Sequence, residues 1–494
     1  MQLKQLVQHL KALSVEGSLE TEVAGIAYDS RRITPGMVFV AIPGHNTDGH
    51  EFIGTALERG ASAIVCERNG IVPSRATRIK VKDVREALAH LASHYYQQPS
   101  AKLKVIGVTG TNGKTTVSFM IKSMLEQAGI KTGLMGTVHY AVGERVIPAQ
   151  RTTPEALEVQ QMMAQMLRAG CEACVMEVSS HALEQKRVLD VEFDVAIFTN
   201  LTHDHLDYHK TMENYFEAKA RLFAAISEGR KKAAAVINID DVFGARLAER
   251  TRVEVVLTYG VEQSAKLRAT EIQLSGEGSR FTVETESEKF QCRIPLIGRH
   301  NIYNSLAAIG AGLALQIKVP DIQTALSQMP AVPGRLQRVD AGQPFGVYVD
   351  YAHTDDALRN VLQTVKEITK GRILLLFGCG GNRDAAKRAK MGRIAGQLAD
   401  FTIISSDNPR KEVPERIAAQ IEEGYRSVRQ EGYVIELDRQ RAIKQLLGKA
   451  ESDDTVLIAG KGHETYQEFH DTVVPFDDCV HAREGLEELG YSRE

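Results

Sequence analysis

A glycine-rich segment, Gly110-Thr-Asn-Gly-Lys-Thr-Thr116, lies between an apolar run at residues 105–108 and a helical pattern over residues 115–127. Glycines allow backbone N–H groups to approach phosphate oxygens closely, and the N-terminus of a helix adds a favourable dipole. The order of strand, glycine loop and helix therefore predicts a phosphate-binding loop in an α/β fold.

Within this loop, Lys114 is expected to reach the outer phosphates of a nucleotide, and Thr115 or Thr116 to help hold Mg²⁺. The spacing departs from the usual G-x-x-x-x-G-K-T pattern, because the fifth residue before Gly113 is Val108 and not glycine. A glycine turn with an unrelated lysine is the alternative interpretation, and the strand and helix on either side argue against it.

Apolar runs alternate with helix-length segments along most of the chain. The further runs are residues 174–178, 195–199, 234–237, 347–350, 373–377, 401–405 and 456–459. Continuous apolar strands that alternate with amphipathic helices are typical of parallel sheets covered on both faces. The alternation therefore predicts an α/β protein.

Two short breaks, at residues 97–100 and 330–334, divide the chain. At about 150 residues per domain, a chain of 494 residues is also too long for one ordinary core. We expect three domains: a small α/β N-terminal domain at residues 1–100, a central phosphate-loop domain with a mainly parallel sheet at residues 101–332, and a C-terminal Rossmann-like domain at residues 333–494.

Composition excludes several classes of protein. The 60 basic and 63 acidic residues give a net charge of -3, so no large basic surface is expected to bind nucleic acid. No run approaches the ~20 apolar residues that span a bilayer, and the first residues lack the apolar core of a signal peptide. Six cysteines cannot form a disulfide scaffold, which favours the cytoplasm. Cys171 and Cys174 form a C-x-x-C pair without a second pair, so we expect buried thiols and not zinc ligands.

Carboxylates and imidazoles follow two of the apolar runs. Glu177 and His181 follow the first, and His203, His205 and His209 follow the second. Because open α/β sheets bind ligands at the carboxyl ends of their strands, these groups could hold Mg²⁺ on nucleotide phosphates. Three histidines so close together also fit zinc, which leaves a metallohydrolase as an alternative, although a zinc hydrolase has no need of a phosphate loop.

Two further segments have more than one interpretation. Lys219 lies in an amphipathic helical pattern, and its sequence context alone predicts a lysine whose stem covers apolar surface. Gly378-Cys-Gly-Gly-Asn-Arg383 is similar to a dinucleotide fingerprint, but that motif requires glycine at the position of Arg383. A nicotinamide oxidoreductase is therefore disfavoured.

Taken in order, the motifs resemble those of the Mur ligases, which share a short G-T-x-G-K-T loop with folylpolyglutamate synthases. The segments that carry the resemblance are the phosphate loop, Asp29-Ser-Arg31, Gly44-His-Asn-Thr-Asp-Gly49, Thr152-Thr-Pro-Glu155, Glu177-Val-Ser-Ser-His-Ala-Leu183, residues 200–207, residues 215–223, Gly334-Arg335, Val349-Asp-Tyr-Ala-His-Thr354 and Gly378–Arg383. They cover nearly the whole chain, and the diaminopimelate-adding members resemble it most.

The resemblance implies an ATP-dependent, magnesium-requiring acid–amino-acid ligase. Its expected reaction joins meso-diaminopimelate to the D-glutamate γ-carboxylate of UDP-N-acetylmuramoyl-L-alanyl-D-glutamate through an acyl phosphate. This places the chain in peptidoglycan precursor synthesis, and so in cell-wall formation, cell shape and cell division, as a cytoplasmic monomer with small-molecule partners only. A folylpolyglutamate synthase and a P-loop ATPase that moves partners without ligation are the alternatives.

The resemblance also implies roles for individual residues. The implied catalytic residues are Lys114, Lys219, Glu177 and His205, and the implied metal site consists of Thr115, Glu177, His205 and Lys219, the last as a carbamate. The implied ATP-binding residues are Gly110, Thr111, Asn112, Gly113, Lys114, Thr115, Thr116, Asn301, Asn304 and Arg335. The N-terminal domain would bind the uridine nucleotide, and the implied contacts to the UDP-muramoyl-dipeptide are Ser30, Thr152, Thr153, Ser179, Gln185 and Arg187.

Asp407-Asn-Pro-Arg410 follows the apolar run at residues 401–405. The planar fork of an arginine binds a carboxylate through two parallel hydrogen bonds, and meso-diaminopimelate differs from L-lysine by a distal carboxylate. An arginine here therefore favours diaminopimelate, whereas a solvated loop arginine is the alternative. With the resemblance, the implied diaminopimelate-binding residues are Arg383, Asp407, Asn408, Pro409, Arg410, Gly460 and Glu464. Arg151 departs from the family, which often has asparagine at this place.

Overall fold

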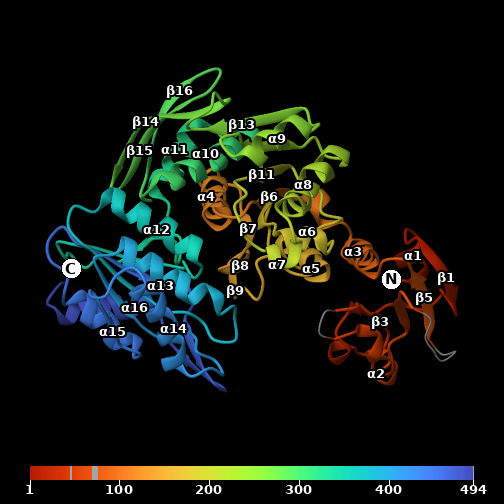
Figure 1. The fold of residues 1–494 in the computed structure, drawn as a ribbon. Coiled ribbons are helices and arrows are strands. Elements are labelled where there is room, and N and C mark those ends of the chain that lie inside the picture. The colour runs from red at the N-terminus through yellow and green to blue at the C-terminus, as the bar shows by residue number, and fades with distance from the viewer. Residues whose placement is uncertain (45–46, 69–75, 493–494) are drawn as a thin grey trace. The chain divides into compact units, whose positions relative to one another are not determined.

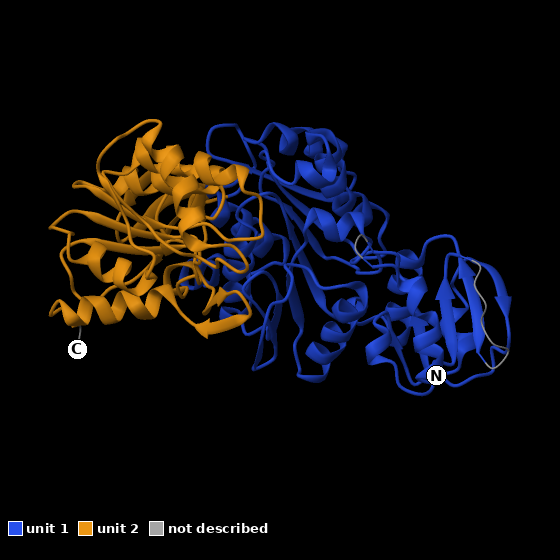
Figure 2. Ribbon diagram, turned by 60° about the horizontal axis from the view of Figure 1, so that its bottom comes forward, with its two compact units in different colours: residues 1–268, 284–287, 303–325 blue, residues 269–283, 288–302, 326–494 orange. Residues whose placement is uncertain are grey.

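A computed structural model describes residues 1–44, 47–68 and 76–492. The chain divides into two compact units (Figure 2). The first consists of residues 1–268, 284–287 and 303–325, and the second of residues 269–283, 288–302 and 326–494. Both units combine helices with sheets, as the alternation in the sequence predicts.

The N-terminal part of the first unit holds a five-stranded sheet in the order β1-β5-β4-β3-β2. Its strands are β1 (Ala12–Glu16), β2 (Gly25–Ala27), β3 (Met37–Val40), β4 (Ala63–Cys66) and β5 (Thr77–Val81), and its helices are α1 (Leu3–Val7), α2 (Ile53–Glu58) and α3 (Val84–Tyr95). Only β1 is antiparallel to its neighbour. Asp83 caps α3 by accepting hydrogen bonds from the backbone N–H groups of Arg85 and Glu86. Residues 45–46 of the predicted uridine-nucleotide motif lie outside the described residues.

The rest of the first unit is built on strands in the order β13-β12-β11-β6-β10-β7-β8-β9. The strands are β6 (Lys104–Thr109), β7 (Thr132–Met135), β8 (His139–Val142), β9 (Arg145–Pro148), β10 (Ala173–Glu177), β11 (Val195–Phe198), β12 (Ala234–Asn238) and β13 (Val255–Gly260). The helices are α4 (Lys114–Gln127), α5 (Ala156–Arg168), α6 (Ser180–Glu184), α7 (Leu206–His209), α8 (Met212–Glu228) and α9 (Val242–Arg250). Figure 1 shows them around these strands.

The six adjacent strands β13, β12, β11, β6, β10 and β7 are parallel to one another, which confirms the mainly parallel sheet. The predicted strands in this part match β6, β10, β11 and β12 to within a residue or two at their ends. The antiparallel strands β8 and β9 were not predicted, because β9 is short and its side chains are mostly exposed. Beyond β13 the chain continues through β14 (Leu267–Ser275), β15 (Gly278–Glu284), β16 (Lys289–Ile294), α10 (Arg299–Ala314) and α11 (Val319–Gln328).

The C-terminal part of the second unit has a six-stranded sheet in the order β17-β18-β22-β19-β20-β21. Its strands are β17 (Gln337–Arg338), β18 (Gly346–Asp350), β19 (Ile373–Phe377), β20 (Phe401–Ile404), β21 (Tyr433–Ile435) and β22 (Thr455–Ala459), followed by a hairpin of β23 (Tyr466–Phe469) and β24 (Thr472–Pro475). The helices are α12 (Asp355–Ile368), α13 (Ala386–Leu398), α14 (Pro414–Arg426), α15 (Arg439–Leu447) and α16 (Asp478–Glu488).

Helices cover both faces of this sheet, as expected for a Rossmann-like domain. One apolar core joins α12, α13 and α14 to side chains such as Leu375 and Leu457. The other joins α15 and α16 to their neighbours along the same strands, Leu374 and Val456. Because successive strand residues point to opposite faces, the continuous apolar runs supply both cores.

Two predictions from composition concern the whole chain. Among the described residues, no helix is both long and apolar enough to cross a membrane. Cys171 and Cys174 are buried free thiols, and burial raises the pKa of the Cys174 thiol. Both thiols therefore behave as small apolar side chains of the core.

Candidate active site

The phosphate loop connects β6 to α4, and two of its glycines are required by the structure. Gly110 and Gly113 have φ angles of 149° and 87°. A Cβ atom on Gly110 would lie 1.8 Å from Oγ1 of Thr199, and a Cβ on Gly113 would lie 2.3 Å from Oδ1 of Asn304. Any larger residue would therefore disturb both the backbone and a neighbouring side chain.

The loop is fixed to the segment that follows β11. The backbone N–H of Thr111 donates to the carbonyl of Asn200 over 2.8 Å, and that of Asn112 donates to Oδ1 of Asn200 over 2.9 Å. Thr199 Oγ1 donates to the carbonyl of Asn112 over 2.6 Å. These bonds hold the loop in one conformation, so its remaining N–H groups are pre-organised for an anion.

The side chain of Lys114 folds back over the phosphate loop. Its Nζ donates to the carbonyls of Gly110, at 3.0 Å, and Thr111, at 2.7 Å. The ammonium is thus held against the loop, at the N-terminus of α4. This is the position that the motif predicts for a lysine that contacts phosphates.

Lys219, on α8, is buried beneath the same loop, with 1% of the residue exposed. Its Nζ donates to the carbonyl of Gly110 over 2.7 Å and lies 4.6 Å from the ring centroid of Tyr215. Burial, and then the charge of Lys114, hold the pKa of Lys219 well below its usual value. The interpretation from helical pattern alone, a lysine with its charged end in water, is wrong. The role that the resemblance implies for Lys219, a carbamate that supports Mg²⁺, stays a prediction.

Glu177 ends β10 and is 1% exposed. Its two carboxylate oxygens accept hydrogen bonds from the backbone N–H of Thr137 at 2.8 Å and from its hydroxyl at 2.9 Å. In the sheet Glu177 pairs with Val108, two residues before Gly110 of the phosphate loop. The carboxylate therefore lies on the strand next to the loop, at the edge where ligands of such sheets bind.

Three of the histidines predicted near the metal, His181, His205 and His209, make ring contacts with one another or with Tyr215. His209 stacks on Tyr215 at 5.0 Å between ring centroids and its Nε2 lies 2.9 Å from the Ser180 hydroxyl, so it is a packed, buried residue. His181 and His205 meet edge to face at 4.9 Å. Burial, together with His205, lowers the pKa of His181 to about 4.

His205 is the histidine that the resemblance assigns to the metal. Partial burial, with the charges of Lys114 and Lys219, lowers its pKa and favours the neutral imidazole. No group of three or more His, Cys, Asp or Glu side chains that could hold a metal occurs in residues 1–44, 47–68 and 76–492. The zinc alternative therefore has no donor set in these parts of the chain, whereas a site that uses a threonine and a modified lysine is of another kind.

Five of the residues predicted to contact the muramoyl-dipeptide lie close to one another. Thr153 Oγ1 donates to the carbonyl of Glu177 over 2.8 Å and accepts from the backbone N–H of Ser179 over 3.0 Å. Arg187 donates to the Thr153 carbonyl over 3.0 Å and to Gln185 Oε1 over 2.7 Å. Thr152 is linked through Thr137, with 3.1 Å between their hydroxyl oxygens.

Ser30, the sixth residue of this set, belongs to a short 3₁₀ helix (Ser30–Arg32) in the N-terminal part of the first unit. Two residues of the network were not predicted as site residues. Thr137 holds Glu177, and Glu155 pairs with Arg187 over 3.1 Å and with Arg151. Glu155 belongs to the Thr152–Glu155 motif, so the sequence could have indicated it as a site residue. Thr137 belongs to no motif, so nothing in the sequence indicated its role.

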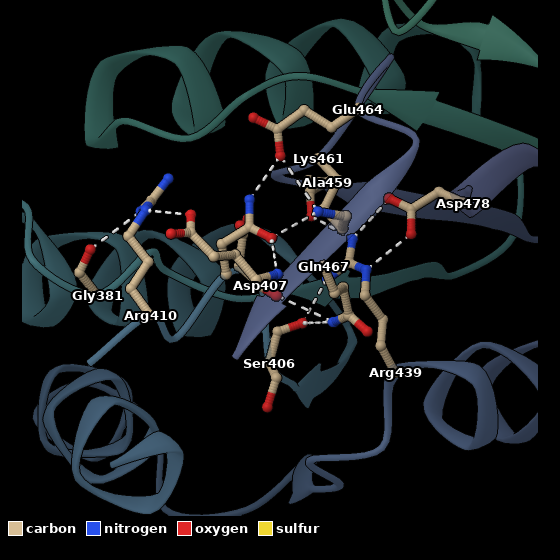
Figure 3. A network of polar contacts seen from close by, with 12 residues as sticks. Gly381, Ser406, Asp407, Arg410, Arg439, Ala459, Lys461, Glu464, Gln467 and Asp478 are labelled. Atoms are coloured by element: carbon tan, nitrogen blue, oxygen red, sulfur yellow. Dashed lines mark hydrogen bonds and ion pairs between the residues drawn. The ribbon is translucent and has the colours of Figure 1, made fainter. Parts of the chain in front are cut away.

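The predicted diaminopimelate-binding residues come from three segments of the second unit, which hold Arg383, Asp407–Arg410, and Gly460 with Glu464. Figure 3 shows Asp407, Arg410 and Glu464. Asn408 Nδ2 donates to Glu464 Oε2 over 2.8 Å. The fully buried Lys461 donates to Asn408 Oδ1 over 3.1 Å and to the same Glu464 oxygen over 3.2 Å. A Cβ on Gly460 would lie 2.8 Å from Asp407 Oδ2. Lys461, between Gly460 and Glu464 in the sequence, was not predicted as a site residue.

Arg410 and Arg383 differ in their surroundings. Arg410 has an 18% exposed side chain and pairs with Glu468, whereas Arg383 is exposed. Burial raises the pKa of Glu464, although Lys461 opposes the shift. Asp407, Asn408, Gly460 and Glu464 thus lie together, and Arg383 stays a prediction.

The three predicted ATP-binding residues outside the phosphate loop, Asn301, Asn304 and Arg335, are divided between the units. Asn304 belongs to the first unit and lies against Gly113, as described above. Asn301 donates to the carbonyl of Ile297 over 2.8 Å, and the Arg335 guanidinium lies 5.4 Å from the ring centroid of Tyr351. Both belong to the second unit.

Comparisons with known proteins identify the family. Residues 22–96 match the model described as "Mur ligase family, catalytic domain", residues 108–312 match "Mur ligase middle domain", and residues 334–462 match "Mur ligase, glutamate ligase domain". Each match lies inside one of the three predicted domains, whose boundaries remain a prediction.

Two relatives carry the name UDP-N-acetylmuramoyl-L-alanyl-D-glutamate–2,6-diaminopimelate ligase. The relative from Syntrophomonas wolfei subsp. wolfei is 45% identical over 98% of this chain and 99% of its own length. The relative from Clostridium tetani is 45% identical over 99% of this chain and 100% of its own. A solved structure of a ligase with the same name is 31% identical, with a TM-score of 0.72 over 100% of both chains. The three-domain α/β fold is thereby confirmed, and the chain belongs to the Mur ligase family.

Proposed function

We propose that this chain is an ATP-dependent ligase that joins meso-diaminopimelate to the D-glutamate γ-carboxylate of UDP-N-acetylmuramoyl-L-alanyl-D-glutamate. The names and full-length coverage of its relatives support this substrate pair. The observation that carries the proposal is the position of the phosphate loop. It starts two residues after Val108, and Val108 pairs in the sheet with Glu177, whose carbonyl accepts a hydrogen bond from Thr153 of the predicted dipeptide-binding network.

The charges at this place explain how the first step can occur. A carboxylate and the γ-phosphate of ATP repel each other, so the site must neutralise both. Lys114 supplies a positive charge at the loop, and the helix N-terminus adds its dipole. An oxygen of the γ-carboxylate attacks the γ-phosphorus, and the bond from phosphorus to the β–γ bridging oxygen breaks. The products are ADP and an acyl phosphate.

In the second step the amine of diaminopimelate attacks the acyl carbon. The bond from carbon to the phosphate oxygen breaks, phosphate leaves, and the nitrogen loses a proton as the amide forms. Alignment of three substrates accounts for much of the rate enhancement, because each is held by its own group of residues. Arg187, Thr153 and Ser179 would orient the carboxylate-bearing substrate, and Asn408 and Glu464 the amine.

The residues beside the loop fit Mg²⁺ if Lys219 carries a carbamate. Glu177 offers a buried carboxylate, Thr115 a hydroxyl and His205 an imidazole favoured in its neutral form. Lys219 as an ammonium would repel the metal, whereas a carbamate would attract it. When bound, Mg²⁺ would neutralise phosphate oxygens and polarise the transferring group.

Lys219 is suited to carbamoylation. Its lowered pKa favours the neutral amine, which is the form that attacks CO₂. Addition of CO₂ forms an N–C bond and releases one proton, so a buried amine becomes a carboxylate. That anion would lie beside Lys114 and compensate its charge.

We also propose that the chain works in the cytoplasm as a monomer. ATP and nucleotide-linked precursors are cytoplasmic substrates, and the cysteines are free thiols. Size-exclusion chromatography with light scattering tests the monomer directly.

The test that separates ligation from a P-loop ATPase is the dependence of ADP release on the other substrates. A ligase needs both the nucleotide-peptide and the amine for sustained ADP release, because the acyl phosphate cannot turn over without the amine. Steady ADP release with ATP alone would contradict the proposal. Folylpolyglutamate synthase activity is excluded if folate and glutamate do not support ADP release.

Replacing Arg410 by alanine should raise the Michaelis constant for diaminopimelate by at least about tenfold. The distal carboxylate would lose a bidentate partner after leaving water, and about 1.4 kcal/mol corresponds to one decade. Michaelis constants for ATP and the nucleotide-peptide should change little. L-Lysine lacks the distal carboxylate, so its weak use should be unchanged or slightly improved. Equal losses for both amines would show that Arg410 supports the domain and does not read the substrate.

A further inference from the structure

The β23–β24 hairpin holds the Asp407–Arg410 loop through hydrogen bonds that involve backbone groups of both segments. Gln467 Nε2 donates to the carbonyl of Asp407 over 3.0 Å, as Figure 3 shows, and the backbone N–H of Glu468 donates to Asn408 Oδ1 over 3.1 Å. Arg410 is bridged to Phe469, with its N–H donating to the Glu468 carbonyl over 2.9 Å and its carbonyl accepting from the His470 N–H over 2.7 Å. The hairpin is therefore part of the loop's support.

This support holds Arg410 in an unusual backbone conformation. Arg410 has a φ angle of 53°, in the left-handed region that arginine rarely adopts. The two backbone hydrogen bonds from the hairpin hold it there. The side chain consequently leaves the loop in a direction that is set by the hairpin and not by the loop sequence alone.

The Arg410 guanidinium is held at two of its three nitrogens. Nε donates to Glu468 Oε2 over 2.9 Å, and Nη1 donates to the carbonyl of Gly381 over 3.0 Å. Among the described residues, Nη2 has no hydrogen-bond partner. A guanidinium fixed in this manner presents Nη2 and the remaining N–H of Nη1 side by side, which is the pair of donors that a carboxylate takes up.

Glu468 is therefore in the right place to position Arg410. Its side chain is 34% exposed and that of Arg410 is 18% exposed, so water screens the pair and little net attraction results from the charges alone. What the contact supplies is orientation. An arginine side chain has many rotamers, and ordering them before the substrate arrives reduces the cost of binding.

We propose that Glu468 is a specificity-positioning residue, which orients Arg410 so that the enzyme prefers an amine substrate with a distal carboxylate. The inference rests on the proposed function, in which Arg410 reads that carboxylate. It adds a residue outside the predicted substrate contacts, and assigns the β23–β24 hairpin to amine selection. L-Lysine, which lacks the distal carboxylate, gains nothing from the orientation of Arg410.

Replacing Glu468 by alanine should raise the Michaelis constant for diaminopimelate about fivefold, because the rotamers of Arg410 must then be ordered during binding. Its kcat at saturating diaminopimelate should stay within about twofold of the wild-type value, since the carboxylate contact lies away from the reacting amine. The Michaelis constant for L-lysine should not change. Glu468→Gln keeps an oxygen acceptor of the same length and should restore most of the preference for diaminopimelate.

The matched control is Asp471→Ala. Asp471 is an exposed carboxylate at the turn of the same hairpin and pairs only with the exposed His470 in the described structure. Its replacement should leave the ratio of kcat/KM for the two amines unchanged. Thermal unfolding of each variant checks that the hairpin and its domain remain folded.

A double-mutant cycle separates this inference from the proposed function. If Glu468 acts through Arg410, then Arg410→Ala with Glu468→Ala should use diaminopimelate no worse than Arg410→Ala alone. Additive losses in the double variant would overturn the positioning role. So would equal losses for both amines in Glu468→Ala, or improved use of diaminopimelate by that variant. A selective loss in Arg410→Ala without one in Glu468→Ala overturns this inference alone. No selective loss in Arg410→Ala overturns the role of Arg410 in reading the distal carboxylate, and this inference with it, whereas a wild-type enzyme that prefers L-lysine overturns the proposed function.

Discussion

Replacing Lys114 by alanine should lower kcat at least about 100-fold, because the site loses the side-chain cation that stabilises the transferring phosphate. The loop itself should survive, since Thr111 and Asn112 are held by Asn200 and Thr199 independently of Lys114. The measurement is ADP release at saturating substrates, with circular dichroism to confirm folding.

Lys122→Ala provides the control for Lys114. Lys122 is on the same helix, α4, and makes an i,i+4 ion pair with Glu126. Such pairs contribute about 0.3–0.5 kcal/mol to stability and none to catalysis. A folded Lys114→Ala variant with near-normal turnover, beside a normal Lys122→Ala variant, would show that the loop assignment is wrong.

Replacing Lys219 should leave the enzyme nearly inactive. If Lys219 is carbamoylated, its removal deletes a carboxylate from the predicted magnesium site, and a small carboxylate such as acetate should restore part of the activity to Lys219→Ala. Lys219→Met fills most of the buried volume without an amine, so it should fold at least as well and stay inactive with acetate. Comparing Lys219→Ala with Lys219→Met separates the effect of lost core packing from the effect of the lost carboxylate.

The modification itself can be observed with carbon-13 bicarbonate, which should give a carbamate signal in the NMR spectrum of the wild type and not of Lys219→Met. An active alanine variant, together with an unlabelled wild type, would contradict the carbamate. Arg221→Ala is a suitable control, because Arg221 is on the same helix, half exposed, and pairs with Glu184.

The strands that position the site could be predicted from the sequence because their signals are local. Continuous apolar runs gave β6, β10, β19 and β20 with boundaries close to those observed. The hairpins β8–β9 and β23–β24 have short, partly exposed strands, so alternation and hydropathy gave little signal for them. A structure was needed to find the hairpin that supports the Asp407–Arg410 loop.

The residues of the site divide in a similar way. The glycines of the loop were predictable because only glycine tolerates their φ angles and the close approach of Thr199 and Asn304. The burial of Lys219 was not, because a helical pattern does not tell which polar residue on the buried face will find a partner. Its partner is a carbonyl more than a hundred residues earlier in the chain. The contact between Arg410 and Glu468 likewise depends on tertiary structure.

The proposed ligation of meso-diaminopimelate to the nucleotide-peptide is tested most directly by identifying the product. The purified chain is incubated with ATP, Mg²⁺, UDP-N-acetylmuramoyl-L-alanyl-D-glutamate and an equimolar mixture of meso-diaminopimelate and L-lysine, and the nucleotide-linked product is identified by mass spectrometry. The account predicts the diaminopimelate-containing tripeptide, formed in equal amount with ADP and phosphate. A product that contains mainly lysine, or ADP release without any amide product, would contradict it.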